Sequence, residues 1–287
     1  MKNSGITDPH FRQAIEAIDS GNINELENLI AEHPRLIKER LHTNGDGYFK
    51  KPYLLWFVAD NPIRTGKLAD NIVEVTRLLI QSVKKLAPET FLNQINFTLG
   101  LVATGRTPRE CGVQIALIDL LIDGGAIPGN GLGALANGNL EAARHLLNRG
   151  GKPTLAAAVC LEPADEMSSL GATASAAEKL TALAAAAFYG KADSIKLLLQ
   201  MGANPDGYPE SNSGFHSHAT PLHQAVSSGS LDAVKLLVEA GANTGATDKI
   251  YSGTPLDWAD YLQREAGGDE AARENFALIE TYLQGLN

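Results

Sequence analysis

The stretch TPLHQAVSSGSLDAVKLLVEAGAN at residues 220–243 decides the fold, because it aligns without a gap with TALAAAAFYGKADSIKLLLQMGAN at residues 181–204. In both copies a Gly follows the first Thr after 9 positions, and a second Gly follows after 21 positions. Self-similarity of this kind is typical of repeat architectures, in which each copy is one small structural unit. The two copies therefore predict a repeated unit instead of one globular core.

An apolar stripe with helical spacing recurs along the chain. Counted from Gly229, apolar residues stand at +2, +5, +8 and +9, and they are Leu231, Val234, Leu237 and Val238. Steps of three, three and one place all four on one face of an α-helix. The same stripe follows, in chain order, Gly21, Asp70, Gly112 (with Gln114 as a polar departure), Gly138, Gly190 and Glu274. Seven copies predict seven helices that each present one apolar face.

A second helix precedes each stripe, and the ends of the helices carry sequence signals. Thr220-Pro221, Thr254-Pro255 and Asp8-Pro9 combine an N-cap residue with a proline in the first turn. We expect Thr181 to begin a helix in the same way. A left-handed glycine commonly ends a helix, and the second Gly of four units falls there: Gly124, Gly150, Gly202 and Gly241. The unit is thus a helix, a tight turn, a helix and a connection.

These residues resemble the ankyrin repeat. The match is plainest at residues 220–243, close at 181–204, and begins again with TPLDWADYLQ at 254–263. Residues 12–32 and 129–151 match mainly in the second helix. The resemblance implies an all-α fold, an ankyrin-type helical solenoid of about seven to eight helix pairs with irregular loops and insertions.

The helix pairs are expected to stack, because a pair with one apolar stripe cannot bury it alone. We expect one solenoid over residues 1–287, with irregular repeats at 8–125, short-loop repeats at 126–180 and well-matched repeats at 181–284. The long step between the stripes of Gly138 and Gly190 predicts a degenerate eighth unit that begins at Thr154. Residues 42–52 predict a Gly-rich finger, and residues 60–71 an insertion between two helices of one unit.

Composition limits the classes of function. The chain has 287 residues, a net charge of −9 and 44% hydrophobic residues, which is typical of a folded soluble protein. The acidic balance argues against a nucleic-acid partner. No run of apolar residues is long enough to span a membrane, and no apolar leader is visible, so we expect a cytoplasmic protein without a membrane partner. Two cysteines cannot form a disulfide framework or a four-cysteine zinc site.

Aromatic residues are the first candidates for binding a partner. Tyr48, Phe49 and Trp56 cannot all face inward on one stripe, so some of them are expected on the surface. Large aromatic side chains are common anchors of protein interfaces. Near the other end, Asp257, Trp258 and Tyr261 fit the same interpretation, as do four residues of a long connection: Tyr208, Phe215, His216 and His218.

The resemblance assigns two further positions. In the ankyrin pattern the residue after the fourth motif position faces the groove, which here selects Gln224 and Trp258. The His of the TPLH motif is structural in that family, so His223 is expected to bond the Thr hydroxyl and turn backbone of its own or the next unit.

Three arginines carry two open interpretations. Arg64, Arg106 and Arg109 stand near Gly-rich turns, and arginine is suited to capturing carboxylates or phosphates. A small anionic ligand is therefore one hypothesis, with Asp60 also near the site. Structural ion pairs with Asp60, Glu110 and Asp119 are the other hypothesis, and the favoured one.

Metal and nucleophile chemistry have weaker signals. His216 and His218 could ligate a metal with Asp257, but a solvated loop is favoured because no Cys or Glu cluster supports them. Cys111 lies near a helix start, yet a small buried apolar role is favoured for it, and Cys160 is expected in the core. The glycines at 124–133 lack the strand and Lys of a phosphate loop. No cofactor and no metal are expected.

The sequence supports two hypotheses for function. The repeat favours a non-enzymatic module that binds a protein or peptide through its concave groove and loop fingers. The alternative is a small-molecule-binding protein or an enzyme, with a pocket built on a modified ankyrin stack, because missing fingers and insertions in the middle of the chain are unusual for a plain repeat protein.

Overall fold

A computed structural model describes residues 6–42, 48–161 and 164–286 of the chain. It divides into two compact units, Met1–Lys152 and Pro153–Asn287. Every regular element of the described residues is a helix, so the all-α prediction is confirmed. Among the described residues each unit contains four helix pairs, which agrees with the predicted seven to eight. The single solenoid over the whole chain stays a prediction.

The N-terminal unit consists of two helical layers and two short extra helices. Its elements are α1 (Pro9–Ser20), α2 (Ile23–Glu32), α3 (Arg35–Lys38), the 3₁₀-helix η2 (Leu54–Ala59), α4 (Ile72–Leu86), α5 (Phe91–Thr104), α6 (Arg106–Glu110), α7 (Gln114–Asp123), α8 (Leu132–Ala136) and α9 (Leu140–Asn148). The first helices α1, η2, α5 and α8 pack in series, and so do the second helices α2, α4, α7 and α9. The predicted finger at 42–52 is described only in part, since residues 43–47 lie outside the described ranges.

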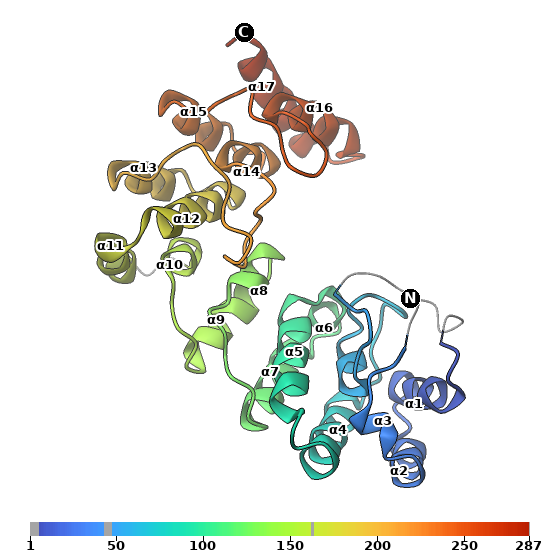
Figure 1. The fold of residues 1–287 in the computed structure, drawn as a ribbon. Helices are drawn as coiled ribbons and strands as arrows, with labels where there is room; N and C mark the ends of the chain where they lie inside the picture. The colour runs from blue at the N-terminus through green and yellow to red at the C-terminus, as the bar shows by residue number, and fades with distance from the viewer. Residues whose placement is uncertain (1–5, 43–47, 162–163, 287) are drawn as a thin grey trace. The chain divides into compact units, whose positions relative to one another are not determined.

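The C-terminal unit is the more regular of the two. Its helices are α10 (Leu155–Leu161), α11 (Ala164–Thr173), α12 (Ala176–Phe188), α13 (Ala192–Gln200), α14 (Pro221–Ser227), α15 (Leu231–Glu239), α16 (Pro255–Glu265) and α17 (Glu270–Gln284). The layer of first helices runs α10, α12, α14, α16, and the layer of second helices runs α13, α15, α17, with α11 packed on α10 (Figure 1).

The apolar stripe explains why these helices stack. Its +5 residue is fully buried in all seven predicted copies, as Leu26, Val75, Leu117, Ala143, Ile195, Val234 and Ile279. Each stripe turns toward the neighbouring pairs, so one continuous core forms within each unit. Burial of apolar surface is therefore shared between pairs.

The predicted eighth unit exists as the pair α10 and α11. Its first helix begins after Thr154, whose hydroxyl accepts the N–H of Ala157 at 3.1 Å. The corresponding prediction for Thr181 is wrong, because α12 begins five residues earlier, at Ala176. Ser175 and Glu178 form a capping box there, and the Thr181 hydroxyl donates to the carbonyl of Ala177 inside the helix.

Three of the four predicted helix-ending glycines are confirmed as left-handed. Gly150, Gly202 and Gly241 have φ of +98°, +80° and +92°. Gly124 does not, since its φ is −67°, and the following Gly125 takes the left-handed role at +112°. The doubled glycine in this unit moves the turn one residue along the chain.

Replacing Leu237 by Ala tests the shared core. Leu237 is fully buried on α15, and the lost methyl groups leave a cavity. We expect the free energy of unfolding of the whole chain, measured in urea by circular dichroism, to fall by about 3 kcal/mol. The matched control is Leu278→Ala on α17, where half of the side chain is exposed, and a loss there equal to that of Leu237→Ala would contradict the described stacking.

Candidate functional site

The start of α16 is fixed by a reciprocal cap between Thr254 and Asp257. The Thr254 hydroxyl accepts the N–H of Asp257 at 3.2 Å, while the Asp257 carboxylate accepts the N–H and hydroxyl of Thr254 at 2.8 and 2.7 Å. These donors lower the pKa of Asp257 below its ordinary value. The cap sets the orientation of the next turns of the helix, which carry Trp258 and Tyr261.

A buried carboxylate shapes the turn that precedes α16. Asp248 accepts the N–H groups of Ile250, Tyr251 and Gly253 at 2.7–2.9 Å and the indole N–H of Trp258 at 3.1 Å. Burial raises the pKa of Asp248, but these four donors outweigh it and bring the pKa to about 2. One side chain thereby fixes both the backbone at Tyr251 and the ring of Trp258.

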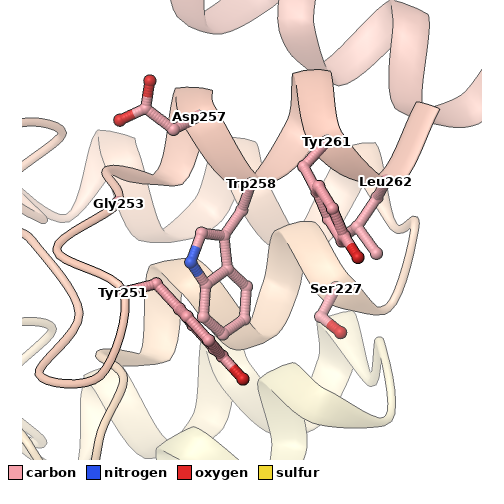
Figure 2. A pocket seen from close by; sticks show the side chains of 7 residues that line it. All are labelled: Ser227, Tyr251, Gly253, Asp257, Trp258, Tyr261 and Leu262. Atoms are coloured by element: carbon pink, nitrogen blue, oxygen red, sulfur yellow. The ribbon is translucent and has the colours of Figure 1, made fainter. Parts of the chain in front are cut away.

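A pocket of about 480 Å³ lies where this turn meets the first-helix layer. It is lined by Ser227, Tyr251, Gly253, Asp257, Trp258, Tyr261 and Leu262, and we call it the aromatic pocket. Figure 2 shows the Trp258 ring between the side chains of Tyr251 and Tyr261. Tyr251 is 77% and Tyr261 57% exposed. The surface of the pocket is mostly apolar and open to solvent.

His223 packs against Trp258 of the pocket and has the structural role that was predicted for it. Its Nδ1 accepts from the Thr220 hydroxyl at 2.8 Å, and its Nε2 donates to the carbonyl of Gly253, in the next unit, at 3.0 Å. Burial lowers the pKa of His223, which agrees with a neutral ring in this arrangement. The ring also packs edge-on against Trp258 at 5.1 Å between centroids.

Of three further predicted residues of this region, two are buried and one is partly buried. Gln224 is 2% exposed, because α14 is packed between α12 and α16, so the prediction that it faces the groove is wrong. Phe215 is also buried and packs edge-on against Phe188. Tyr208 is partly buried, with its hydroxyl donating to the Thr247 carbonyl and Lys249 lying 4.2 Å from its ring centre.

The histidines of the long connection pack against aromatic rings. The His216 ring lies 5.0 Å from those of Phe188 and Phe215, and His218 lies 6.2 Å from Trp258. Across the described part of the chain, no three His, Cys, Asp or Glu side chains are grouped to hold a metal ion. Asp257, the proposed third ligand, has one carboxylate oxygen engaged by Thr254 in the helix cap.

The N-terminal aromatic cluster is mostly core. Phe49 and Trp56 are 4% and 3% exposed, so the prediction that they anchor a partner from the surface is corrected, while Tyr48 is 60% exposed. The prediction assumed that a helix buries only one face. It fails here because η2 is buried on all sides, with α1, α4 and α5 packed around it. Trp56 stacks on Phe97 with ring centres 3.9 Å apart.

The three predicted arginines do not converge on one site. Arg64 is a buried structural residue, bonded to Asp19 at 2.6 Å and to the Phe57 carbonyl at 3.0 Å. Arg106 pairs with Glu110 on the surface of α6 at 3.3 Å, and Arg109 donates to Asn139. Anion capture by Arg64 is therefore contradicted by its burial, and its pairing follows the structural alternative.

Asp60 is likewise structural. Its carboxylate accepts the N–H groups of Arg64, Thr65 and Gly66 at 2.9–3.2 Å and the Thr107 hydroxyl at 3.1 Å. It thus holds the inserted loop against α6, which lies between the two helices of the next unit. Asp119, the other predicted carboxylate, pairs with His145 and Arg149 instead of the three arginines.

Sequence reasoning selected Asp257, Trp258 and Tyr261 in the aromatic pocket and missed Tyr251. The signal for Tyr251 was an apolar pair, Ile250 and Tyr251, inside a turn just before Thr254-Pro255. Turn residues are normally polar, and both of these side chains are more than half exposed.

Comparisons with known proteins identify the repeat. Residues 132–248 match the sequence model of the ankyrin-repeat family, described as three copies. Residues 132–248 are therefore ankyrin repeats, and the all-α fold class of the described chain is the predicted one. A solved structure that matches is the crystal structure of the human ASB11 ankyrin repeat domain, which is 22% identical and covers 72% of this chain and 96% of that chain, with a TM-score of 0.34. No curated protein sequence matches the chain.

Two physical properties complete the description. None of the helices in the described ranges is long and apolar enough to cross a bilayer. Cys160 is buried as predicted, whereas Cys111 is exposed, so the prediction that Cys111 is a buried apolar residue is wrong.

Asp248→Asn tests the anchoring carboxylate. A neutral amide cannot replace a charged carboxylate that accepts from four N–H donors. We therefore expect the free energy of unfolding at neutral pH to fall by about 2 kcal/mol. The wild-type carboxylate stabilises the fold above its unfolded pKa of 3.8, and this contribution is lost as the pH falls through about 2. Urea titrations should therefore show the two proteins converging at acid pH, and a constant difference would contradict the role of the charge.

The two cysteines should react at very different rates. Burial raises the pKa of Cys160 to about 12, whereas Cys111 is exposed. Ellman's reagent is expected to modify one thiol rapidly in the native protein and the second only in denaturant. Rapid modification of the one remaining thiol in native Cys111→Ser would contradict the burial of Cys160.

Proposed function

We propose that this protein is an interaction module whose aromatic pocket docks a segment of a partner polypeptide. Ankyrin repeats are generally protein–protein interaction modules, which supports the class of function. The observation that carries the proposal is the exposed aromatic surface of Tyr251, Trp258 and Tyr261 on a rigid cap and turn. Aromatic side chains held in place lose little conformational freedom when they bind, so they are efficient anchors.

The exposed apolar side chains extend beyond the pocket. Ile250 is 60% exposed beside Tyr251, and both stand on the turn that Asp248 holds. Exposed apolar side chains that gather at one place commonly mark a binding site. The pocket gives room for one large side chain of the partner, and the turn offers two exposed apolar side chains, Ile250 and Tyr251.

Charge indicates that the partner segment is basic. Residues 153–287 contain 17 Asp and Glu residues and 7 Lys and Arg residues, which gives a net charge of −10. Residues 1–152 contain 16 Asp and Glu residues and 17 Lys and Arg residues and are near neutral. A field of this sign attracts cationic segments and speeds their association, most strongly at low salt. We therefore infer a partner segment that combines a large apolar residue with Lys or Arg.

One part of the alternative hypothesis is not supported, namely a ligand site at the three predicted arginines. Arg64, Arg106 and Arg109 bond to separate partners within the fold instead of converging on one site. The non-enzymatic interpretation is the one that the geometry supports best.

A random peptide library displayed on phage tests the proposal without a known partner. The full chain is the bait, and selected peptides are measured against Trp258→Ala and Tyr261→Ala. We expect basic peptides with a large apolar residue, bound at least about tenfold more weakly by each variant, as for anchor residues of interfaces.

Leu278→Ala on α17 is the control, because it removes an exposed apolar side chain of the same unit outside the pocket. Peptides that bind all four proteins equally would contradict docking at the aromatic pocket. Selected peptides that are neutral or acidic but still need Trp258 would contradict the inferred charge of the partner. They would still support docking at the aromatic pocket.

A further inference from the structure

A second pocket, in the N-terminal unit, has the opposite character. It has a volume of about 520 Å³ and is lined by Arg40, Tyr48, Lys50, Lys51, Trp56, Asn93 and Phe97. Three of these residues are cationic, three are aromatic and one is an amide, and no carboxylate of the described ranges belongs to the lining. We call it the basic pocket. Its chemistry is unexpected in a chain with a net charge of −9.

Arg40 is held in place by rings and amide groups. Its guanidinium lies 4.4 Å from the ring centre of Tyr53 and 5.1 Å from that of Trp56. It donates to the carbonyl of Lys51 at 3.1 Å and to the side-chain oxygen of Asn93 at 3.2 Å. Two neutral acceptors thus occupy two of its five N–H donors. In the described ranges no carboxylate forms an ion pair with Arg40, so its charge is not neutralised there.

The aromatic rings against which Arg40 lies make this arrangement rigid. Trp56 is 3% exposed and stacks on Phe97, so the platform under Arg40 belongs to the core. A guanidinium on aromatic rings is positioned without losing its charge. The basic pocket is therefore organised before any ligand arrives, which lowers the entropic cost of binding.

Lys51 adds a second cation on a backbone that Arg40 contacts. Its φ is +63°, a left-handed conformation that residues with a side chain rarely adopt. In this conformation the Lys51 carbonyl accepts from Arg40, and its exposed side chain belongs to the same lining. Glycine would be the easier residue here, so a lysine in this position is consistent with a role for its charge.

We propose that the basic pocket binds a polyanionic organic molecule with phosphate or carboxylate groups. Arg40 supplies a planar donor that suits either group, and Lys51 supplies a point charge beside it. The volume exceeds what one inorganic phosphate needs, which leaves room for an organic ligand with more than one anionic group. The N-terminal unit, which is near neutral overall, does not repel such a ligand as the acidic C-terminal unit would.

Isothermal titration of the full chain with tripolyphosphate, with citrate and with inorganic phosphate tests this proposal. We expect tripolyphosphate or citrate to bind, and inorganic phosphate to bind more weakly than either. Binding of tripolyphosphate alone assigns the ligand to phosphate compounds, and binding of citrate alone assigns it to polycarboxylates. No binding of either at millimolar concentration overturns the proposal.

Three variants localise the binding. Arg40→Gln and Lys51→Gly should each weaken it by about tenfold or more, as expected for a lost charge-assisted contact. Lys51→Gly also relieves the left-handed backbone, so the fold should be at least as stable and a weaker affinity cannot come from unfolding. Arg144→Gln, on the exposed face of α9, is the matched control and should bind like wild type. Equal binding by all variants overturns the proposal.

Discussion

Each helix pair of this protein has one apolar face, which it can hide only against another pair. The fully buried +5 residues, such as Leu26, Val75 and Val234, mark the line along which the pairs meet. Because burial is shared between neighbours, a pair tolerates a changed connection as long as its stripe survives. This explains how the chain accommodates η2 in place of a regular first helix and the inserted loop that Asp60 holds.

The same packing decides which side chains remain available for binding. In the first-helix layer α14 has neighbours on both sides, so Gln224 is buried, while Trp258 on α16 remains partly accessible. Asp248 then fixes the preceding turn against the Trp258 indole. The aromatic pocket thus depends on a repeat scaffold and on one buried carboxylate. The basic pocket depends in a similar way on the buried Trp56, which supports Arg40.

Periodicity predicted the helices and their buried faces, because both follow from local spacing and the need to cover apolar surface. It also found the helix starts at Asp8, Thr220 and Thr254. The predicted start of α12 at Thr181 was wrong because Ser175 and Glu178 form a capping box earlier in the chain. Thr181 matches the repeat motif but lies inside the helix. Other features depend on contacts between distant segments. Phe49 and Trp56 are buried by such contacts, and Arg64 pairs with Asp19, 45 residues away in the chain. Spacing within one element carries no information about such contacts.

The chain has two tryptophans, Trp56 in the basic pocket and Trp258 in the aromatic pocket, so fluorine NMR of protein labelled with 5-fluorotryptophan observes each pocket separately. The most direct test of polypeptide docking at the aromatic pocket is a titration of this labelled protein with a peptide that it binds. The described arrangement predicts that the Trp258 resonance moves and the Trp56 resonance does not. A peptide that binds while the Trp258 resonance stays unchanged would contradict it.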